Sequence, residues 1–198
     1  MNVLLNGRGG KVGSVLGPGL EAAGHMLVET LDAADAMVDF TVPNAVAQNV
    51  RDAVASGVPC VVGTTGWDAD EFRDAPVTVF YAPNFAIGAV LMMRFAADAA
   101  RHLEAAEIVE LHHAAKLDAP SGTSKLTAER MGGGVSIHSV RLPGLNAHQE
   151  VILGAPGQTL TIRHDAISRE AYTPGVLLAL EKLSSLPPGL TVGLDALL

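Results

Sequence analysis

The chain has 198 residues, of which 48% are hydrophobic and 17% charged, a composition typical of a compact folded protein rather than a disordered one. Its formal net charge of −8 argues against a general nucleic-acid or anionic-membrane surface, since both need an extended positive potential. Cys60 is the only cysteine, which excludes a disulfide scaffold and a cysteine-rich zinc site. No apolar stretch is long enough to span a bilayer, and Met1–Leu5 leads into a glycine turn without signal-peptide features, so a cytoplasmic location is expected.

The first half of the chain alternates short apolar segments with helical patterns. A helix is predicted at Pro43–Ser56, where apolar residues recur at helical spacing, and a short one at Asp68–Phe72. Five strands are predicted, in chain order Met1–Leu5, Leu27–Leu31, Ala36–Thr41, Pro59–Gly63 and Val77–Tyr81. Strands that alternate with helices favour a mostly parallel, doubly wound sheet.

The pattern changes after Pro83. A long apolar helix is predicted at Ala86–Leu103 and another helix at Ser121–Met131, with a strand at Glu107–His113 between them. Three strands and a final helix follow, at Ser136–Arg141, Glu150–Leu153, Gln158–His164 and Pro174–Leu183. Consecutive strands without intervening helices favour an antiparallel or mixed sheet.

The predicted fold class is therefore α/β, in two domains. Residues 1–86 are predicted to form a Rossmann-like dinucleotide-binding domain, completed by the C-terminal segment 172–198. Residues 87–171 are predicted to form a second, smaller α+β domain built on a mixed sheet.

A cluster of glycines follows the first predicted strand, in the segment Gly7-Arg-Gly-Gly-Lys-Val-Gly13. A bound pyrophosphate needs close backbone approach, free N–H groups and the positive end of a helix dipole, and glycines after a strand permit all three. Lys11 adds a cation in the first helical turn. The alternative is a tight turn that binds nothing. The segment Gly63-Thr-Thr-Gly66 lies at the carboxyl edge of the predicted sheet and has the same two interpretations, a contact for the nicotinamide half of a cofactor or a plain turn.

The segment that would bind the adenine ribose is short. Glu29 and Asp32 both lie about 20 residues past the turn, where a ribose-binding acidic residue is expected. Asp32 runs directly into the next predicted strand, which leaves no room for a second crossover helix. The sequence therefore does not distinguish NADH from NADPH.

The highest density of titratable groups lies in the segment 110–123, Glu-Leu-His-His-Ala-Ala-Lys-Leu-Asp-Ala-Pro-Ser-Gly-Thr. Neighbouring strand residues point to opposite faces, so His112 and His113 can share one ligand only where the strand ends. The alternative is a pair of strand-end histidines hydrogen-bonded to backbone. A zinc site is a poor interpretation, because no third ligand lies near and no His-Glu-x-x-His helix is present.

The end of the same segment predicts an anion-binding loop. Ser121 is a natural N-cap, so Gly122 and Thr123 present unpaired N–H groups at the positive end of a helix. Together with Lys116 they predict a pocket for a carboxylate or phosphate, with Asp118 expected to point away from it. A serine hydrolase built on Ser121 is a poor interpretation, because no nucleophile elbow surrounds that residue.

The segment 110–123 resembles the signature of the dihydrodipicolinate reductase family, the 4-hydroxy-tetrahydrodipicolinate reductases of bacterial lysine biosynthesis. The resemblance covers nearly the whole chain. Further matching segments occur in the family's order, at Gly7–Gly13, Val38–Pro43, Val62–Gly66, Ala82–Phe85, Ser139–Gly144, Ala147–Glu150, Ser168–Arg169 and Gly175.

The resemblance implies a two-domain, usually tetrameric oxidoreductase of the diaminopimelate route. It would use NADH or NADPH to reduce 4-hydroxy-tetrahydrodipicolinate to tetrahydrodipicolinate. His112 is implied as the proton donor with Lys116 assisting, and residues 87–171 as the substrate-binding and oligomerisation domain. The implied substrate contacts are His113, Gly122 and Thr123. The implied cofactor contacts are Gly7, Arg8, Gly9, Gly10, Lys11, Val12, Gly63, Thr64, Thr65, Ala82, Pro83, Asn84 and Phe85.

The chain departs from the family pattern in two places. The segment between its second and third strands is shortened to Leu31-Asp-Ala-Ala-Asp, and Ala114 and Ala115 stand where relatives often carry basic residues. Two other functions stay open: a related dehydrogenase for another small dicarboxylate or amino acid, and a non-catalytic nucleotide-binding protein. The expected partners are a small dicarboxylate and further copies of the chain, with no nucleic acid, membrane or metal.

Overall fold

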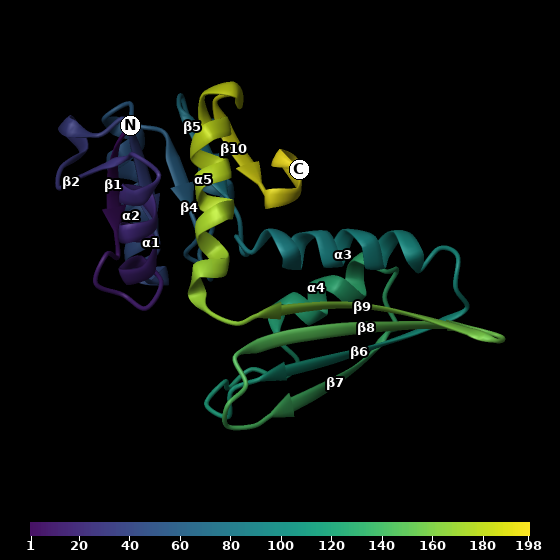
Figure 1. Ribbon diagram of the computed structural model, residues 1–198. Coiled ribbons are helices and arrows are strands. Elements are labelled where there is room, and N and C mark those ends of the chain that lie inside the picture. Colours follow the sequence, from purple (N-terminus) through teal and green to yellow (C-terminus); the bar gives the residue numbers. More distant parts are fainter. The chain divides into compact units, whose positions relative to one another are not determined.

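The computed structural model describes residues 1–198, which divide into two compact units. The first unit joins Met1–Ile87 to Arg169–Leu198, and the second unit is Gly88–Ser168 (Figure 1). No helix is long and apolar enough to cross a membrane.

The first unit is built on a six-stranded sheet in which every neighbouring pair is parallel. The strand order is β10-β5-β4-β3-β1-β2. The bounds are β1 (Asn2–Asn6), β2 (Met26–Val28), β3 (Ala36–Asp39), β4 (Cys60–Val62), β5 (Thr78–Tyr81) and β10 (Gly189–Val192). The central strands β3 and β4 are buried along their whole length, as expected for parallel strands covered on both faces, and they read as apolar runs for that reason.

Three helices pack on this sheet: α1 (Gly13–Ala22), α2 (Pro43–Ala55) and α5 (Thr173–Lys182). The buried stripe of α2 is Val46, Val50 and Ala53, which packs in one cluster with Cys60, Val62 and neighbouring residues of the sheet. Burying each of these valines stabilises the fold by roughly 1.5–3 kcal/mol. The helix predicted at Pro43–Ser56 is confirmed and ends one residue earlier, at Ala55.

The connection from β2 to β3 agrees with the sequence prediction, whereas the end of β2 and the strand β10 do not. Only a short 3₁₀ helix, Leu31–Ala33, separates β2 from β3, so the prediction that no crossover helix fits there is confirmed. The prediction that β2 extends to Leu31 is wrong, because that residue already belongs to the 3₁₀ helix. The strand β10 was not predicted. It has four residues, follows two prolines, and gains its extended form from pairing with β5.

The second unit is built on a mixed four-stranded sheet, as predicted, and its strand order is β7-β6-β8-β9. Its strands are β6 (Ala105–His112), β7 (Ser136–Arg141), β8 (Ala147–Ala155) and β9 (Gln158–Ala166). β6 and β7 are parallel and joined through helix α4 (Gly122–Arg130), whereas β8 runs antiparallel to β6, and β9 to β8. The sheet's core is formed by Ala96 of helix α3 (Ile87–Ala99), Ala128 of α4, and Ile108, Val151 and Leu153 of the strands.

Both helices lie on the same face of this sheet (Figure 1). Two predicted bounds are wrong here. The strand predicted at Glu150–Leu153 is nine residues long, because β8 and β9 form a hairpin that pairs Ala155 with Gln158. The helix predicted to reach Leu103 ends at Ala99 and is followed by turns.

Candidate functional site

The glycine turn of the first unit is a close-packed strand-to-helix connection. Gly7 has a φ of +84°, and a Cβ there would overlap the carbonyl of Phe40. A Cβ on Gly13 would overlap the carbonyl of Gly7, so both positions require glycine for steric reasons. By contrast, no atom lies within 4 Å of the place where a Cβ on Gly9 would stand.

The first turn of α1 has unused hydrogen-bond donors. No side chain caps the helix, and the turn is closed by the Gly10 N–H, which donates to the Gly7 carbonyl at 2.8 Å. Lys11 and Val12 precede the helix, and their N–H groups donate to no protein acceptor. Free N–H groups at the positive end of a helix dipole bind anions, so this turn fits a dinucleotide pyrophosphate.

Arg8 of the glycine turn is paired with two acidic side chains. Its guanidinium forms ion pairs with Glu29 at 3.5 Å and with Glu21 at 3.7 Å, and all three side chains are at least half exposed. Of the two predicted ribose-binding acids, Glu29 is therefore the one joined to the glycine turn. Asp32 lies in the 3₁₀ helix between β2 and β3.

The predicted nicotinamide contacts gather where β1, β3, β4 and β5 reach their carboxyl ends. Phe40 links them: a Cβ on Gly63 would overlap its ring, and the ring of Phe85 lies 5.5 Å away between centroids. Thr64 is buried, and its hydroxyl accepts the Thr41 N–H at 2.7 Å. The sheet therefore places predicted residues from three separate loops at one edge.

The remaining predicted nicotinamide contacts differ in burial and in hydrogen bonding. Ala82 is buried and its N–H donates to the Val62 carbonyl at 3.1 Å. The Asn84 side chain accepts the Ala86 N–H at 2.9 Å, so it supports the local loop. Thr65 and Pro83 are exposed on the same loops.

A buried carboxylate, missed at the sequence level, organises this edge. Asp39 ends β3 with no exposed surface, and one of its oxygens accepts hydrogen bonds from the Thr41 hydroxyl at 2.8 Å and the Thr64 hydroxyl at 2.7 Å. Its other oxygen accepts from the Asn49 amide at 2.7 Å. A carboxylate at the end of an apolar strand was a signal in the sequence, because burying one requires several donors.

In the second unit, the register of the sheet determines which side chains lie next to His112. His112 pairs with Arg141 of β7 and with Ala147 of β8. Two residues earlier on β6, Glu110 pairs with Ser139 and Gln149. Alternation places both rows on the face that carries α3 and α4.

Glu110 is the buried centre of this site and was not predicted as a site residue. Its side chain has no exposed surface and is held by Arg141 through two bonds, Nη2 to Oε1 at 2.7 Å and Nη1 to Oε2 at 3.0 Å. The same Oε2 contacts Nδ1 of His112. An ionised carboxylate only accepts hydrogen bonds, so Nδ1 carries a proton and Nε2 is the ring nitrogen left for chemistry.

Neighbouring groups shift the pKa of His112 in opposite directions. Burial lowers the pKa of His112 below its usual value, the hydrogen bond and charge of Glu110 act to raise it, and Lys116 and Arg141 lower it again. Burial acts to raise the pKa of Glu110, but the hydrogen bonds from Arg141, Ser139 and His112 outweigh it and the pKa is lowered. The carboxylate is therefore ionised beside an imidazole that gives up its proton readily.

The position of Asp118 contradicts the prediction that it points away from the anion pocket. Its carboxylate accepts a hydrogen bond from Nζ of Lys116 at 2.5 Å. That bond, together with the charge of Lys116 and backbone hydrogen bonds that include the Gly122 N–H, lowers the pKa of Asp118. A carboxylate from the chain thus occupies two of the groups predicted to bind a substrate carboxylate.

The N-terminus of α4 is fixed by a buried polar network. Ser121 is the N-cap, as predicted, and its hydroxyl accepts the Ser124 N–H at 3.2 Å. The Ser124 hydroxyl donates to the Gln149 amide oxygen at 2.8 Å, and the Gln149 amide donates to Thr127 at 2.7 Å. These bonds hold the helix end that presents Gly122 and Thr123 onto the sheet.

The second predicted histidine lies just beyond the strand. β6 ends at His112, which is the condition for the two histidines to face one ligand. The backbone of His113 donates to the Asn146 carbonyl at 3.3 Å and accepts from the Lys116 N–H at 3.0 Å, while its exposed imidazole makes no hydrogen bond. The interpretation of backbone-bonded histidine side chains is wrong for both residues.

Two geometric observations concern the zinc and serine-hydrolase interpretations. No group of three or more His, Cys, Asp or Glu side chains could hold a metal ion. The Ser121 hydroxyl bonds to that of Ser124 at 2.8 Å and not to a histidine.

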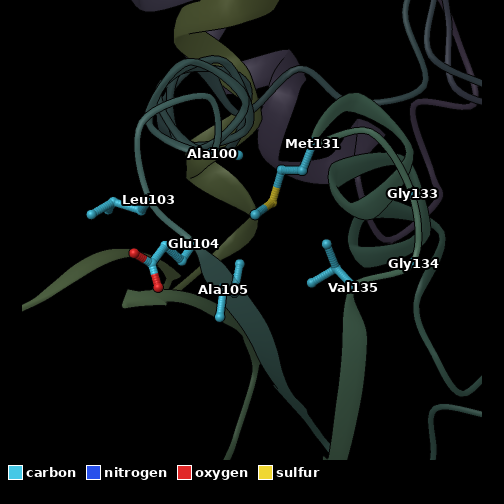
Figure 2. Close-up of a pocket in the computed structure, with 9 residues that line it drawn as sticks. Ala100, Leu103, Glu104, Ala105, Met131, Gly133, Gly134 and Val135 are labelled. Carbon is cyan, nitrogen blue, oxygen red and sulfur yellow. The ribbon is translucent and has the colours of Figure 1, made fainter. Parts of the chain in front are cut away.

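A hollow of about 340 Å³ lies at the opposite end of β6 (Figure 2). Ala105 stands at its floor, and His112 is seven residues further along the strand, about 23 Å away at the usual rise. Its lining residues are apolar or glycine except for Glu104, the one charged side chain. No predicted site residue lines it.

Comparison with known proteins gives one family. The family model for the N-terminal part of dihydrodipicolinate reductase matches residues 19–85, and the model for the C-terminal part matches residues 88–198. The glycine turn at Gly7–Gly13 precedes the first of these matches.

Individual relatives agree with the family models. A 4-hydroxy-tetrahydrodipicolinate reductase from Desulfitobacterium hafniense (strain DSM 10664 / DCB-2) is 50% identical over 211 residues, covering 89% of this chain and 79% of that protein. One from Mycolicibacterium gilvum (strain PYR-GCK) is 42% identical over 244 residues, covering 100% of this chain and 99% of that protein. Both alignments are longer than the chain, so both relatives contain segments absent here.

A solved structure supports the same grouping. The dipicolinate-bound dihydrodipicolinate reductase from Paenisporosarcina sp. TG-14 superposes with a TM-score of 0.85 at 29% identity, covering 100% of this chain and 99% of that one. The similarity extends over both units.

Proposed function

Because the chain belongs to the dihydrodipicolinate reductase family, we propose that it reduces 4-hydroxy-tetrahydrodipicolinate to tetrahydrodipicolinate with NADH or NADPH. The family consists of NAD(P)H-dependent oxidoreductases of the diaminopimelate route to lysine. The observation that carries the proposal for this chain is the Glu110–His112 pair beside Lys116, at the end of β6. The net reaction adds one hydride and one proton and releases one water.

We assign cofactor binding to the first unit. The pyrophosphate would lie on the N–H groups of the turn from Gly7 to Val12, with Lys11 as a nearby cation. The nicotinamide would lie at the edge formed by Gly63, Thr64 and Phe85. When bound, the cofactor supplies the hydride.

We assign proton transfer to His112. Its Nδ1 is held by Glu110, so Nε2 would donate the proton to the ring carbon next to the one that receives the hydride. The pKa of His112 is lowered by burial in the free protein, and two substrate carboxylates close by would raise it by favouring the imidazolium. Substrate binding would thereby charge the proton donor.

We assign the substrate carboxylates to the second unit's anion pocket. Lys116, His113 and the N–H groups of Gly122 and Thr123 are the candidate contacts. The Paenisporosarcina relative binds dipicolinate, a planar ring with two carboxylates, which supports a ligand of that kind here. A substrate carboxylate would have to replace that of Asp118 at Lys116.

The oligomer is part of the proposal. The face of the second sheet opposite α3 and α4 carries no helix and presents the half-buried residues Val109, Leu111, Val140 and Ile152. We propose that copies of the chain pack on this face to form a homotetramer in the cytoplasm. Light scattering after size exclusion would give a tetramer mass for the wild type and a smaller one for Val109→Lys.

The test of the activity is a coupled assay followed at the nicotinamide absorbance. Purified protein is mixed with pyruvate, aspartate semialdehyde and a dihydrodipicolinate synthase, with NADH and NADPH in separate reactions. We expect loss of absorbance that depends on the synthase, at a rate about 10²- to 10⁴-fold lower with His112→Gln. Folded protein that binds the cofactor but never oxidises it would support the non-catalytic alternative. Turnover only with other small dicarboxylates or amino acids would support a related dehydrogenase.

A further inference from the structure

Arg141 connects the two catalytic groups of the second unit. Its guanidinium holds both oxygens of Glu110, at 2.7 and 3.0 Å, and Glu110 in turn holds His112. The same guanidinium donates from Nη2 to the backbone carbonyl of Asp118 at 2.7 Å. One side chain therefore bonds to the partner of His112 and to the loop that carries Lys116.

The Arg141 guanidinium is largely buried, and both of its Nη groups are hydrogen-bonded to these partners. Only 17% of the Arg141 side chain is exposed, and Nη1 also donates to the Val140 carbonyl at 2.8 Å. Its buried Nε has no hydrogen-bond partner, an unfavourable arrangement that is retained while both Nη groups are engaged. Lysine could not replace it, since a planar fork is needed to hold a carboxylate and a carbonyl together.

The charges near His112 come from few groups. Glu110 lies on the same strand, Arg141 on β7, and Lys116 on the loop that follows β6, where it is paired with Asp118. The strands beyond contribute the uncharged Ala147 and Gln149 and, on β9 in the same row as Gln149, His164. Glu110 is thus the one carboxylate in direct contact with the imidazole, and Arg141 compensates its charge.

We propose that Arg141 is a positioning residue that acts through Glu110 on the proton held by His112 and through the Asp118 carbonyl on the placement of Lys116. This inference rests on the proposed reductase function. With Arg141 in place, Glu110 fixes the tautomer of His112 without holding its proton too tightly. Without it, the uncompensated carboxylate would hold that proton to higher pH.

Two variants should move the titration of His112 in opposite directions. In Arg141→Met, the pH above which kcat declines should rise by about one unit, and the KM for the dicarboxylate should rise because the Lys116 loop loses an anchor. In Glu110→Gln, the pH above which kcat declines should fall by about one unit, because the imidazolium loses its hydrogen-bonded carboxylate. A purely structural role would lower activity at all pH values without these opposite shifts.

Further variants separate charge from folding. Arg141→Lys keeps the positive charge, so the pH above which kcat declines should stay within about a few tenths of a unit of the wild-type value. The KM for the dicarboxylate should still rise, because lysine lacks the planar fork. The double variant Glu110→Gln/Arg141→Met removes both buried charges and serves where a single variant does not fold. Its His112 should titrate lower than in Arg141→Met. Arg51→Met is the matched control, since it removes another bidentate Arg–Glu pair, with Glu71, at an exposed place away from the site.

The readout that does not need turnover is the NMR titration of the His112 ring, assigned by comparison with His112→Gln. Opposite shifts in Arg141→Met and Glu110→Gln would support the inference even in a protein that fails the coupled assay. A His112 titration unchanged in both variants, or shifted in the same direction by both, would overturn it. A wild type without reductase activity would overturn the proposed function separately.

Discussion

The two predicted binding regions of this protein are constructed by different means. The glycine turn of the first unit is defined by backbone shape, since Gly7 and Gly13 are needed because no side chain fits there. The histidine site of the second unit is defined by charge, since Glu110 and Arg141 form a buried pair around His112. Shape is specified by neighbouring residues in the chain, whereas the charge pair depends on which strands lie side by side.

This difference explains how each region would respond to substitution. Adding a methyl group at Gly7 or Gly13 should disturb the fold and the binding of one ligand together. Changing a charge in the histidine site should alter a proton or a substrate contact and leave the first unit intact. Substitutions in each region test that separation.

The largest effect is expected for His112→Gln. Loss of the proton donor should lower kcat about 10²- to 10⁴-fold, the usual contribution of general acid catalysis. The affinity for NADH or NADPH, measured by fluorescence titration, should stay within twofold of the wild type, because the predicted cofactor contacts belong to the first unit. An unchanged kcat would remove His112 from its assigned role.

The next effect is expected for Gly13→Ala. The new Cβ would overlap the Gly7 carbonyl, and such overpacking costs about 1–3 kcal/mol of unfolding free energy. Cofactor affinity should fall with it, since the turn must open. Gly9→Ala is the matched control, because no atom lies within 4 Å of its added Cβ and its melting temperature should not change. Wild-type stability and cofactor affinity in Gly13→Ala would show that the turn is not the close-packed one described.

A smaller effect is expected for Asp118→Asn. Its carboxylate competes with a substrate carboxylate for Lys116 and the Gly122 N–H, so the neutral variant should lower the KM for the dicarboxylate, or the inhibition constant of dipicolinate, about three- to tenfold. The matched control is Asp70→Asn, which removes an exposed ion pair with Arg73 in the first unit. A raised KM would mean that Asp118 supports the loop more than it blocks the pocket.

The sequence was sufficient where a requirement is local. The glycine turn, the N-cap at Ser121 and the absent crossover helix each depend on residues within a few positions of one another. Glu110 could also have been identified, because a residue two positions before His112 on a strand shares its face. The density of titratable groups pointed to the two histidines, and Glu110 was not identified as their buried neighbour.

The sequence was insufficient where a contact depends on sheet register. Arg141 reaches Glu110 only because β7 runs parallel to β6 with His112 opposite Arg141, and no local pattern fixes that pairing. The same limit applies to β10, which is extended because β5 lies beside it. Asp118 was misplaced for a related reason: its like charge was expected to keep it out of an anion pocket, but without a ligand Lys116 takes the nearest carboxylate.

The smallest effect concerns the first unit, where shape and charge meet. Arg8 is held by Glu29 and Glu21 through ion pairs of 3.5 and 3.7 Å between side chains that are at least half exposed, and such pairs are weak. Glu29→Gln should free Arg8 for the 2′-phosphate of NADPH and lower the KM for NADPH about two- to fivefold relative to that for NADH. Glu21→Gln provides the comparison, because it relaxes the same guanidinium from the helix side. Equal changes for both cofactors would show that Arg8 does not contact the ribose, and the charge of the turn would then act on the pyrophosphate alone.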